Sequence, residues 1–467
     1  MKKVLLLNLP SEVPCYRILH RAKVGEPNYI WPLVDFVCLS GILHEAGFAL
    51  EHKDFQVDRG GSLERFLQGR SYDAVVAAYN PFDEEYDLRQ LKRLHELYPG
   101  TAVYLLASHK DRLESGHTEA LLRANPFVRA LVYDYAYNSL PALMADPASE
   151  DLRNLFLIRD GRLQGRAEDL PQEFVMPVPR HELFRDPAYF HYDSAGGLMT
   201  AAMGSFGCKM QCPFCWGPQL YSKVVTRTPE NLADEMAHIA ACGIEEVYFH
   251  DFSFGYHRDK LLKFCSLVRE RGIKLRWFCS SRFDLMSPET VAAMAAAGCR
   301  CIEFGLESGN YEVRKLYGKS FPDEQVATVM RACKEHGVHA SVFLILGLPE
   351  EDLAAMRRSI RFARDAGFDY LSLNILWVEP LTKLSEKITA TDGSVSPLES
   401  MKKPNFAHTS VSAAQVMALQ RSALRSFYFS APFILGQLRA LRSRKRLLMA
   451  ARTAWKLLRG RASGGAA

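Results

Sequence analysis

Three closely spaced cysteines carry the strongest chemical signal in this chain. Cys208, Cys212 and Cys215 form a C-x3-C-x2-C pattern directly after an apolar segment that is typical of a β-strand. Three thiolates at this spacing can each bind one iron of a cubane iron–sulfur cluster. Because no fourth cysteine follows closely, one iron would stay open to a substrate or a cofactor, which indicates reactivity rather than electron storage alone.

A zinc site or a purely structural role is the alternative for the triplet. A C-x2-C pair alone more often binds zinc, and buried cysteines often only pack. Neither a fourth cysteine nor a histidine at zinc-ligand spacing follows closely, although spacing alone does not exclude His250, which ends the next predicted strand. The elements around the triplet therefore have to distinguish the two metals.

From about residue 195 onward, strand-like segments alternate with helical ones. Thr228 and Ser287 each precede a Pro-Glu pair, which is typical of a capping hydroxyl at a helix start. Six β-α units in series predict a partial TIM-like (β/α)6 barrel, whose site lies at the C-terminal ends of its strands. The cysteine triplet follows the first of them. The predicted strands are 198–203, 246–250, 275–280, 301–306, 341–346 and 370–375.

These features resemble the radical S-adenosylmethionine (SAM) superfamily, whose C-x3-C-x2-C motif follows the first strand of a partial β/α barrel. The resemblance covers roughly residues 195–390. It implies that Cys208, Cys212 and Cys215 hold a 4Fe-4S cluster whose unique iron chelates SAM. It also implies that an electron from the cluster cleaves SAM into methionine and a 5′-deoxyadenosyl radical.

Further residues match this family, and the resemblance gives each a role toward SAM. Phe214 corresponds to the aromatic residue beside the adenine, and Asp251 to the residue that supports the amino group. Glu307 corresponds to an acidic residue near the ribose or the amino group. For Asp251, a carboxylate that caps a loop is the ordinary alternative.

Two more strand ends fit the same family. Ser281 and Arg282 close the third predicted strand, and a guanidinium is a planar, permanently charged donor suited to the SAM carboxylate. An ordinary ion pair between Arg282 and Asp284 is the alternative. Gly347 begins a segment that resembles the adenine loop of the family, where a missing side chain lets the backbone approach the base.

The chain divides into four parts by sequence pattern. Residues 1–140 alternate strand-like and helix-like segments, which predicts an α/β domain with a doubly wound parallel sheet. Residues 141–190 are rich in proline and charge and are predicted to be a linker. The radical SAM barrel is expected over 191–390 and a helical tail over 391–467. The predicted N-terminal strands are 4–8, 74–78, 102–107 and 130–133, with a helix near 39–44.

This domain order resembles the cobalamin-associated radical SAM enzymes, which include methyltransferases and the anaerobic cyclase of chlorophyll synthesis. The resemblance implies a corrin at the C-terminal edge of the N-terminal sheet, facing the barrel mouth. The chain departs from the pattern, because it lacks an Asp-x-His-x-x-Gly motif after the first strand. Bulkier residues at 107–112 and 134–137 replace the usual glycine-containing loops. The alternative is a domain that serves only as a scaffold or a substrate lid.

Composition and charge limit the remaining possibilities. Hydrophobic residues make up 48% and charged residues 24% of the 467 residues, and no apolar run is long enough to span a membrane. The eleven cysteines are an odd number without paired spacing outside the triplet, which indicates a reducing cytoplasm. The net charge of +5 is modest and predicts no nucleic-acid partner.

The tail is the most basic segment of the chain. Residues 421–461 contain eleven Lys or Arg and no acidic residue, interleaved with Phe and Leu. Basic amphipathic helices lie on anionic membranes or bind a partner. Helices that pack on the main body and expose their arginines are the alternative.

We expect a cobalamin-dependent radical SAM enzyme that methylates an unactivated carbon. Its substrate would be a small molecule, a lipid or a peptide-derived compound, and its electron donor a protein such as flavodoxin or ferredoxin. The runner-up uses the same radical for oxidative cyclisation or rearrangement. A methylthiotransferase-like RNA-modifying enzyme would need a second cysteine triplet in the N-terminal domain, which Cys15 and Cys38 cannot supply. The catalytic residues that contact the substrate are not identified by the sequence.

Overall fold

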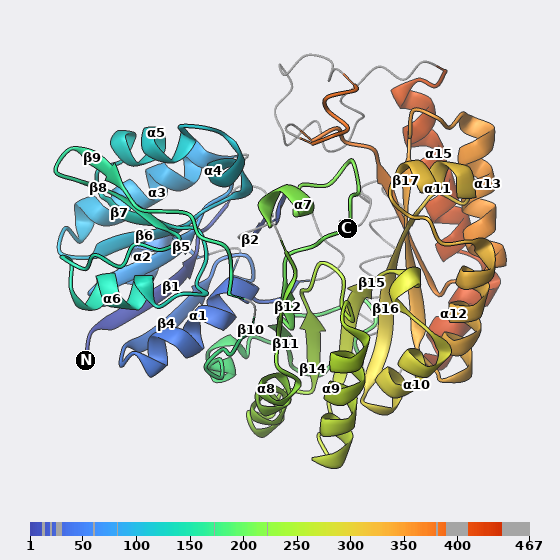
Figure 1. Cartoon of the computed structure of the whole chain (residues 1–467), viewed down its shortest axis with the longest axis horizontal. Coiled ribbons are helices and arrows are strands. Elements are labelled where there is room, and N and C mark those ends of the chain that lie inside the picture. Colours follow the sequence, from blue (N-terminus) through green and yellow to red (C-terminus); the bar gives the residue numbers. More distant parts are fainter. Residues whose placement is uncertain are drawn as a thin grey trace.

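Short apolar segments flanked by helices build two parallel sheets that lie side by side (Figure 1). In that view the N-terminal domain is on the left and the barrel is on the right. The structure is a computed structural model. It describes residues 1–11, 15–18, 21–24, 30–58, 61–81, 83–171, 173–221, 223–379, 382–388 and 410–440.

The N-terminal sheet is doubly wound, as the sequence predicts. Most of its parallel strands are apolar along almost their whole length, because helices cover both faces of such a sheet. Helices α1 (Val34–Glu45) and α6 (Ser139–Ala145) pack on one face. Helices α2 (Leu63–Leu67), α3 (Glu84–Leu97) and α5 (His117–Ala124) pack on the other. The strands are β1 (Lys3–Asn8), β4 (Ala49–Asp54), β5 (Ala74–Ala78), β6 (Ala102–Leu106) and β7 (Val128–Val132).

The order of these strands in the sheet is β4-β1-β5-β6-β7. The direction of winding therefore reverses between β1 and β5, and open α/β sheets bind ligands at the carboxyl ends of the strands beside such a switch point. Strand β4 was not predicted. Its sequence Ala-Leu-Glu-His-Lys-Asp lacks an apolar run, because the strand lies at the edge of the sheet and its side chains are mostly half-buried. A separate hairpin of β2 (Cys15–Ile18) and β3 (Arg21–Val24) follows β1.

The prediction of a linker over 141–190 is wrong for part of that range. Strands β8 (Leu155–Arg159) and β9 (Arg162–Gln164) extend the N-terminal sheet beyond β7 in antiparallel orientation. Leu155 and Leu157 are almost fully buried there, so this short apolar hairpin belongs to the first domain. The later residues do connect the two domains, through β10 (Glu173–Phe174) and the 3-10 helix η1 (His181–Phe184).

The barrel contains the six predicted strands, all parallel and in chain order. Thr228 and Ser287 cap the two predicted helix starts by accepting backbone N–H groups three residues ahead. The helices cover the outer face (Figure 1). The strands are β11 (Met199–Ala202), β14 (Glu246–Phe249), β15 (Arg276–Ser281), β16 (Cys299–Glu307), β17 (His339–Leu346) and β18 (Tyr370–Ile375), and the helices are α8 (Pro229–Ala241), α9 (Arg258–Glu270), α10 (Pro288–Ala296), α12 (Asp323–Glu335) and α13 (Leu353–Asp365).

Side chains fill the interior of the barrel below its strand ends. Glu303 of β16 accepts hydrogen bonds from Tyr248 at 2.6 Å, Tyr192 at 2.7 Å and Ser280 at 2.9 Å. Trp31, from the segment before α1, stacks on Tyr248 with ring centroids 4.4 Å apart. The N-terminal domain therefore contributes a side chain to the interior of the barrel.

The first helix of the tail packs on the barrel. Helix α15 (Ala413–Tyr428) lies along β18, and its Gln420 donates to the carbonyl oxygen of Leu373 at 2.7 Å. The Tyr428 hydroxyl accepts from Leu371 N–H at 3.1 Å and donates to the Leu371 carbonyl oxygen at 2.8 Å. These side chains bond the free edge of β18, so the alternative of a packed tail holds for α15. Residues 441–461 of the basic segment lie outside the described residues.

Helix α16 (Ala431–Ala440) follows α15 and exposes Ile434 and Leu435. Within the described part of the chain, no helix is both long and apolar enough to span a membrane.

We predict that Tyr428→Phe destabilises the barrel by about 1–3 kcal/mol, because it leaves the N–H and C=O of the buried residue Leu371 without this side-chain partner. The measurement is the denaturant midpoint, with Tyr256→Phe at a half-buried loop position as the control. An unchanged midpoint for Tyr428→Phe would show that α15 does not protect the edge of β18.

Candidate functional site

The two ends of the loop that carries the cysteine triplet are held together by a short strand pair, which we call the neck of the loop. Strand β12 (Ser205–Phe206) before the loop pairs antiparallel with β13 (Val225–Arg227) after it. Gly207 follows β12 at φ +82°, and a Cβ on it would lie 2.3 Å from the carbonyl oxygen of Lys223. Only glycine fits this crossing. We call residues 207–224 the cysteine loop.

Asp251, just after β14, anchors the start of this loop. Its buried carboxylate accepts the N–H of Gly204 at 2.8 Å and the hydroxyl of Ser205. Burial raises the pKa of Asp251 to about 6, and these hydrogen bonds oppose that rise. Asp251 thus makes the contacts of a loop-capping carboxylate, and its role toward the amino group of SAM stays a prediction.

None of the three cysteines forms a disulfide bond, and each is partly exposed. A Cβ on Gly217 would lie 3.4 Å from Cβ of Cys208 and 3.5 Å from Sγ of Cys215, so this glycine lets the following backbone approach both residues. The N–H of Gly217 donates to Sγ of Cys215 at 3.4 Å. Among the described residues, the three sulfur atoms do not form a group that lies within 4.8 Å, as ligands of one metal ion would. This spacing disfavours a zinc ion.

Arg282, which follows β15, links a cysteine sulfur to the barrel. Its guanidinium donates to Sγ of Cys212 at 3.7 Å, to the carboxylate of Asp284 at 2.9 and 2.7 Å, and to the carbonyl oxygen of Gly318 at 2.9 Å. The ion pair with Asp284 is therefore present together with the sulfur contact. Burial raises the pKa of the Cys212 thiol, and the positive charges of Lys319 and Arg282 oppose that rise by favouring the thiolate.

Glu307 ends β16 in a conformation that non-glycine residues rarely adopt. Its φ is +67°, next to an irregularity in the pairing with β17. Its carboxylate lies 3.2 Å from Nζ of Lys319, and both side chains are more than nine-tenths buried. A Cβ on Gly305 would lie 2.7 Å from both charged groups, so the pair occupies space that only glycine leaves open. Strained backbone of this kind clusters at functional sites.

The remaining predicted residues lie at the ends of other barrel strands or in the loop itself. Phe214 packs near Tyr317, with ring centroids 6.0 Å apart. Ser281 is buried and donates to the carbonyl oxygen of Phe254 at 2.8 Å. Gly347 adopts a φ of +89°, and a Cβ on it would lie 3.8 Å from Val416 of α15.

The structure thus brings part of the predicted set together around Cys212. Arg282, Glu307 and Lys319 all act electrostatically on that thiol. The contacts that we see for Ser281 and Gly347 are instead with the barrel and α15. Sequence reasoning missed Lys319, because it lies between α11 (Tyr311–Leu316) and α12 rather than at a strand end. Its only sequence signal is the preceding Gly318, which adopts a φ of +73° and ends the turn after α11.

The C-terminal edge of the N-terminal sheet lies against the cysteine loop. The His109 ring, in α4 (His109–Leu113), stacks on Trp216 with centroids 3.7 Å apart, and Trp216 directly follows Cys215. Burial lowers the pKa of His109 to about 4, so the ring is neutral at pH 7. One apolar cluster contains residues of α1, β6 and the cysteine loop, including α7 (Gly217–Leu220).

The bulky segments that replace the expected glycine loops are packed by their own hydrogen bonds. Ser108 and Asp111 form a capping box at the start of α4, and the Tyr79 hydroxyl also donates to Asp111. Tyr133, after β7, donates to the carbonyl oxygen of Asp111 at 2.7 Å. The next residue, Asp134, is buried, and burial raises its pKa to about 6.

Known proteins share part of this sequence. Residues 204–363 match the model of the Radical SAM superfamily. An uncharacterized methyltransferase of Pyrococcus horikoshii is 26% identical over 54% of this chain and 56% of its own length. The hopanoid C-2 methylase of Rhodopseudomonas palustris is 26% identical over 47% of this chain and 42% of its own. A tRNA-2-methylthio-N(6)-dimethylallyladenosine synthase of Mycolicibacterium smegmatis is 26% identical over 70% and 61%. The chain spans less than two thirds of each of these relatives.

Two solved structures share the fold. The radical SAM methyltransferase TsrM of Kitasatospora setae, with cobalamin and a [4Fe-4S] cluster bound, has a TM-score of 0.63 at 18% identity and covers 92% of this chain and 86% of its own. The cobalamin-dependent radical SAM enzyme OxsB, with aqua-cobalamin bound, has a TM-score of 0.65 at 14% identity and covers 99% and 72%. The segment of this chain that matches the Radical SAM superfamily model, residues 204–363, thus contains the cysteine loop and most of the barrel.

Proposed function

We propose that this protein is a cobalamin-dependent radical SAM enzyme that methylates an unactivated carbon. The observation that carries the proposal is the contact between the N-terminal sheet and the cysteine loop. The cysteine loop and the ligand-binding edge of the N-terminal sheet meet at the stack of His109 on Trp216. Radical generation and methyl supply would then take place at neighbouring sites.

The cysteine loop fits a 4Fe-4S cluster. Cys208, Cys212 and Cys215 would each bind one iron, and the N–H of Gly217 and the guanidinium of Arg282 already donate toward two of the sulfurs. Hydrogen bonds to cluster sulfurs tune the reduction potential. When bound, the cluster supplies a low-potential electron to SAM, SAM supplies a carbon-centred radical, and cobalamin supplies a methyl group.

The strand ends beside Cys212 fit the polar groups of SAM. Arg282 offers a permanent positive charge to its carboxylate, and Glu307 offers a carboxylate to its amino group or ribose. Lys319 keeps Glu307 paired in its buried position. Phe214 and Tyr317 would provide an apolar surface for the adenine, and the place of Gly347 in the adenine loop is part of the proposal.

The proposal of cobalamin binding rests on the position of the switch point in the N-terminal sheet, and not on glycine-containing loops at the ends of its strands. The switch point between β1 and β5 opens at the sheet edge that turns toward the cysteine loop. The packed network of Tyr79, Ser108 and Asp111 occupies the edge after β5 and β6. The sheet edge that would hold the corrin in this chain would therefore differ from that of enzymes with glycine-containing loops at the same place.

The substrate would bind at the mouth of the barrel, because Trp31 and the Glu303 network fill the interior below it. His250 follows Tyr248 by two residues and therefore shares its inward face. Ser280 and Asn374 are half-buried at the same end of their strands. These three polar side chains are our candidates for substrate contacts.

We propose partners and location on the same grounds. Radical SAM chemistry needs a reductant, for which flavodoxin or ferredoxin is the proposed donor. Ten cysteines, from Cys38 to Cys333, form no disulfide bond in the described part of the chain, which suits a reducing cytoplasm. Exposed Ile434 and Leu435 on α16 support a peripheral contact with a membrane or a lipid-like substrate.

An RNA methylthiotransferase role is the weaker alternative, although one relative carries that name. The first 140 residues contain only Cys15 and Cys38, and Cys38 is fully buried within α1. Burial also raises the pKa of its thiol, which disfavours a ligand role. Cyclisation or rearrangement remains the runner-up, because it needs the same cluster and SAM site but no methyl transfer.

We predict that Cys208→Ala, Cys212→Ala and Cys215→Ala, singly or combined, abolish both the visible absorbance of the cluster and reductive SAM cleavage. Loss of a thiolate removes an iron ligand. The readouts are iron content and 5′-deoxyadenosine after anaerobic reconstitution, with Cys265→Ala in α9 as the control. SAM cleavage in the triple variant would refute the cluster assignment.

We predict that Glu307→Gln weakens SAM binding at least tenfold and lowers stability by about 3–5 kcal/mol, because Lys319 is left as an unpaired buried charge. Equilibrium dialysis with SAM and thermal unfolding measure the two effects. The double variant Glu307→Gln/Lys319→Met should regain much of the stability but not the SAM affinity. Wild-type SAM affinity in the double variant would reduce Glu307 to a structural role.

We predict that the full chain, reconstituted anaerobically with hydroxocobalamin, keeps about one corrin per chain through gel filtration. With a methyl-accepting substrate it should form S-adenosylhomocysteine as well as 5′-deoxyadenosine, since one SAM supplies the methyl group and another the radical. Corrin retention without S-adenosylhomocysteine would favour the runner-up. Failure to retain a corrin would favour the scaffold role of the N-terminal domain.

A further inference from the structure

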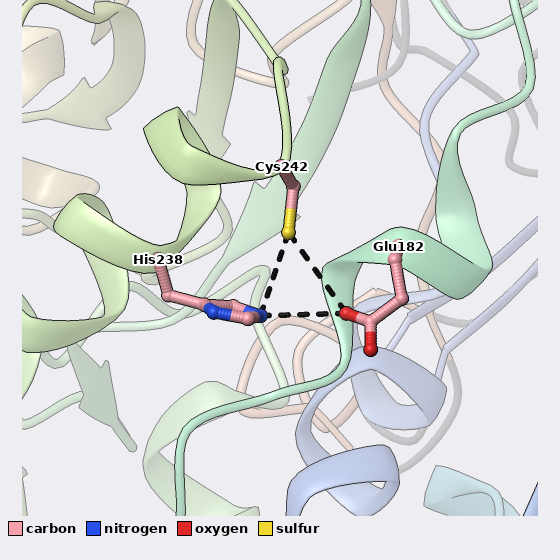
Figure 2. Close-up of side chains that lie close together, drawn as sticks. All are labelled: Glu182, His238 and Cys242. Carbon is pink, nitrogen blue, oxygen red and sulfur yellow. Dashed lines mark hydrogen bonds and ion pairs between the residues drawn. The ribbon is translucent and has the colours of Figure 1, made fainter.

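A second group of metal-ligand side chains lies outside the cysteine loop. Glu182 of η1 meets His238 and Cys242 at the end of α8 (Figure 2). Nε2 of His238 lies 3.3 Å from Oε2 of Glu182 and 3.5 Å from Sγ of Cys242, and that sulfur lies 3.9 Å from the same carboxylate oxygen. One nitrogen, one oxygen and one sulfur thus converge on a single point.

These separations match the ligand shell of a tetrahedral zinc ion. Bonds of about 2.3 Å to sulfur and about 2.0–2.1 Å to nitrogen and oxygen place S and N about 3.6 Å apart, N and O about 3.4 Å apart, and S and O about 3.6 Å apart. The observed 3.5, 3.3 and 3.9 Å follow this pattern. An ordinary N–H···O hydrogen bond would be shorter, at about 2.7–3.2 Å.

The local sequence arranges the three ligands. His238 lies in the last turn of α8, and Cys242 directly follows the helix in a helical conformation four residues later, so the two side chains lie on the same side. Arg180 forms an ion pair with the other carboxylate oxygen of Glu182, which leaves Oε2 facing His238 and Cys242 (Figure 2). About a third of the Glu182 and His238 side chains is exposed, so an ion can enter from solvent and keep a water as fourth ligand.

The position of this group gives the ion a structural task. Helix η1 lies at the junction of the two domains, where Phe184 packs on His52 of β4 at 4.4 Å between ring centroids. His181 bonds Thr200 of β11 at 2.9 Å and Glu235 of α8 at 3.0 Å. An ion held by Glu182, His238 and Cys242 would tie this junction to the outer helix of the barrel.

We propose that Glu182, His238 and Cys242 bind a divalent transition-metal ion, with zinc as the best match, and that the ion clamps η1 to α8. A thiolate, an imidazole and a carboxylate are the ligands that zinc prefers. On binding, Cys242 loses its thiol proton to solvent and the ion stays divalent. The proposal is independent of the cluster, of SAM and of cobalamin.

The test uses the full chain with its iron–sulfur cluster loaded, incubated with zinc and then desalted. We expect about one zinc per chain, and zinc-edge X-ray absorption with a single sulfur neighbour at about 2.3 Å. Cys242→Ser, His238→Gln and Glu182→Gln should each lower the retained zinc at least fivefold. His336→Ala, at an exposed histidine that ends α12, should retain it.

Iron content and circular dichroism show whether each variant is folded. His238→Gln and Glu182→Gln leave every thiol in place, so a loss of zinc in these variants does not come from a missing cysteine. Zinc should also slow hydrogen exchange in residues 180–185 and 236–243 of the wild type but not of Cys242→Ser. Equal zinc retention in all variants would overturn the proposal. So would two or more sulfur neighbours, because that signal would place the zinc on vacant sites of the cysteine loop.

Discussion

The closed neck of the cysteine loop is the constraint on which the rest of the site depends. Two residues on each side of the loop pair as β12 and β13, and Asp251 secures the start of the loop from the next barrel strand. A loop of this length without a neck would sample many conformations, and closing its ends once removes that freedom before any cofactor binds. Three thiols can then be presented at fixed places although none of them lies in a strand or a helix.

The site also depends on the contact between the N-terminal domain and the barrel. The apolar cluster under the cysteine loop continues into the face of the N-terminal sheet that α1 and α6 cover. Trp31 extends the same connection into the barrel interior, where it stacks on Tyr248. An interface built from core residues is expected to be more rigid than a polar contact between independent domains. We therefore expect the N-terminal domain and the barrel to keep a fixed relative position.

Sequence patterns predicted the elements whose signals are local. The buried strands of both sheets are short apolar runs, Thr228 and Ser287 mark helix starts, and the cysteine triplet needs no fold to be recognised. The hidden parts depend on long-range contacts. Edge strand β4 has no apolar run, and β8 and β9 lie in a stretch whose prolines suggested a linker. Lys319 becomes visible only when Glu307 is seen beside it, and Glu182 only when η1 lies against α8.

The stack of His109 on Trp216 has a consequence for electron transfer. Trp216 is covalently next to Cys215, and the sulfur of Cys215 accepts the N–H of Gly217, the residue after that tryptophan. A displacement of α4 would therefore move a hydrogen bond donated to Sγ of Cys215, and hydrogen bonds to the sulfurs of an iron–sulfur cluster set how readily it accepts an electron. In a chain that holds the proposed cluster, the position of α4 would thus influence the reduction potential of that cluster through two adjacent residues, Trp216 and Gly217.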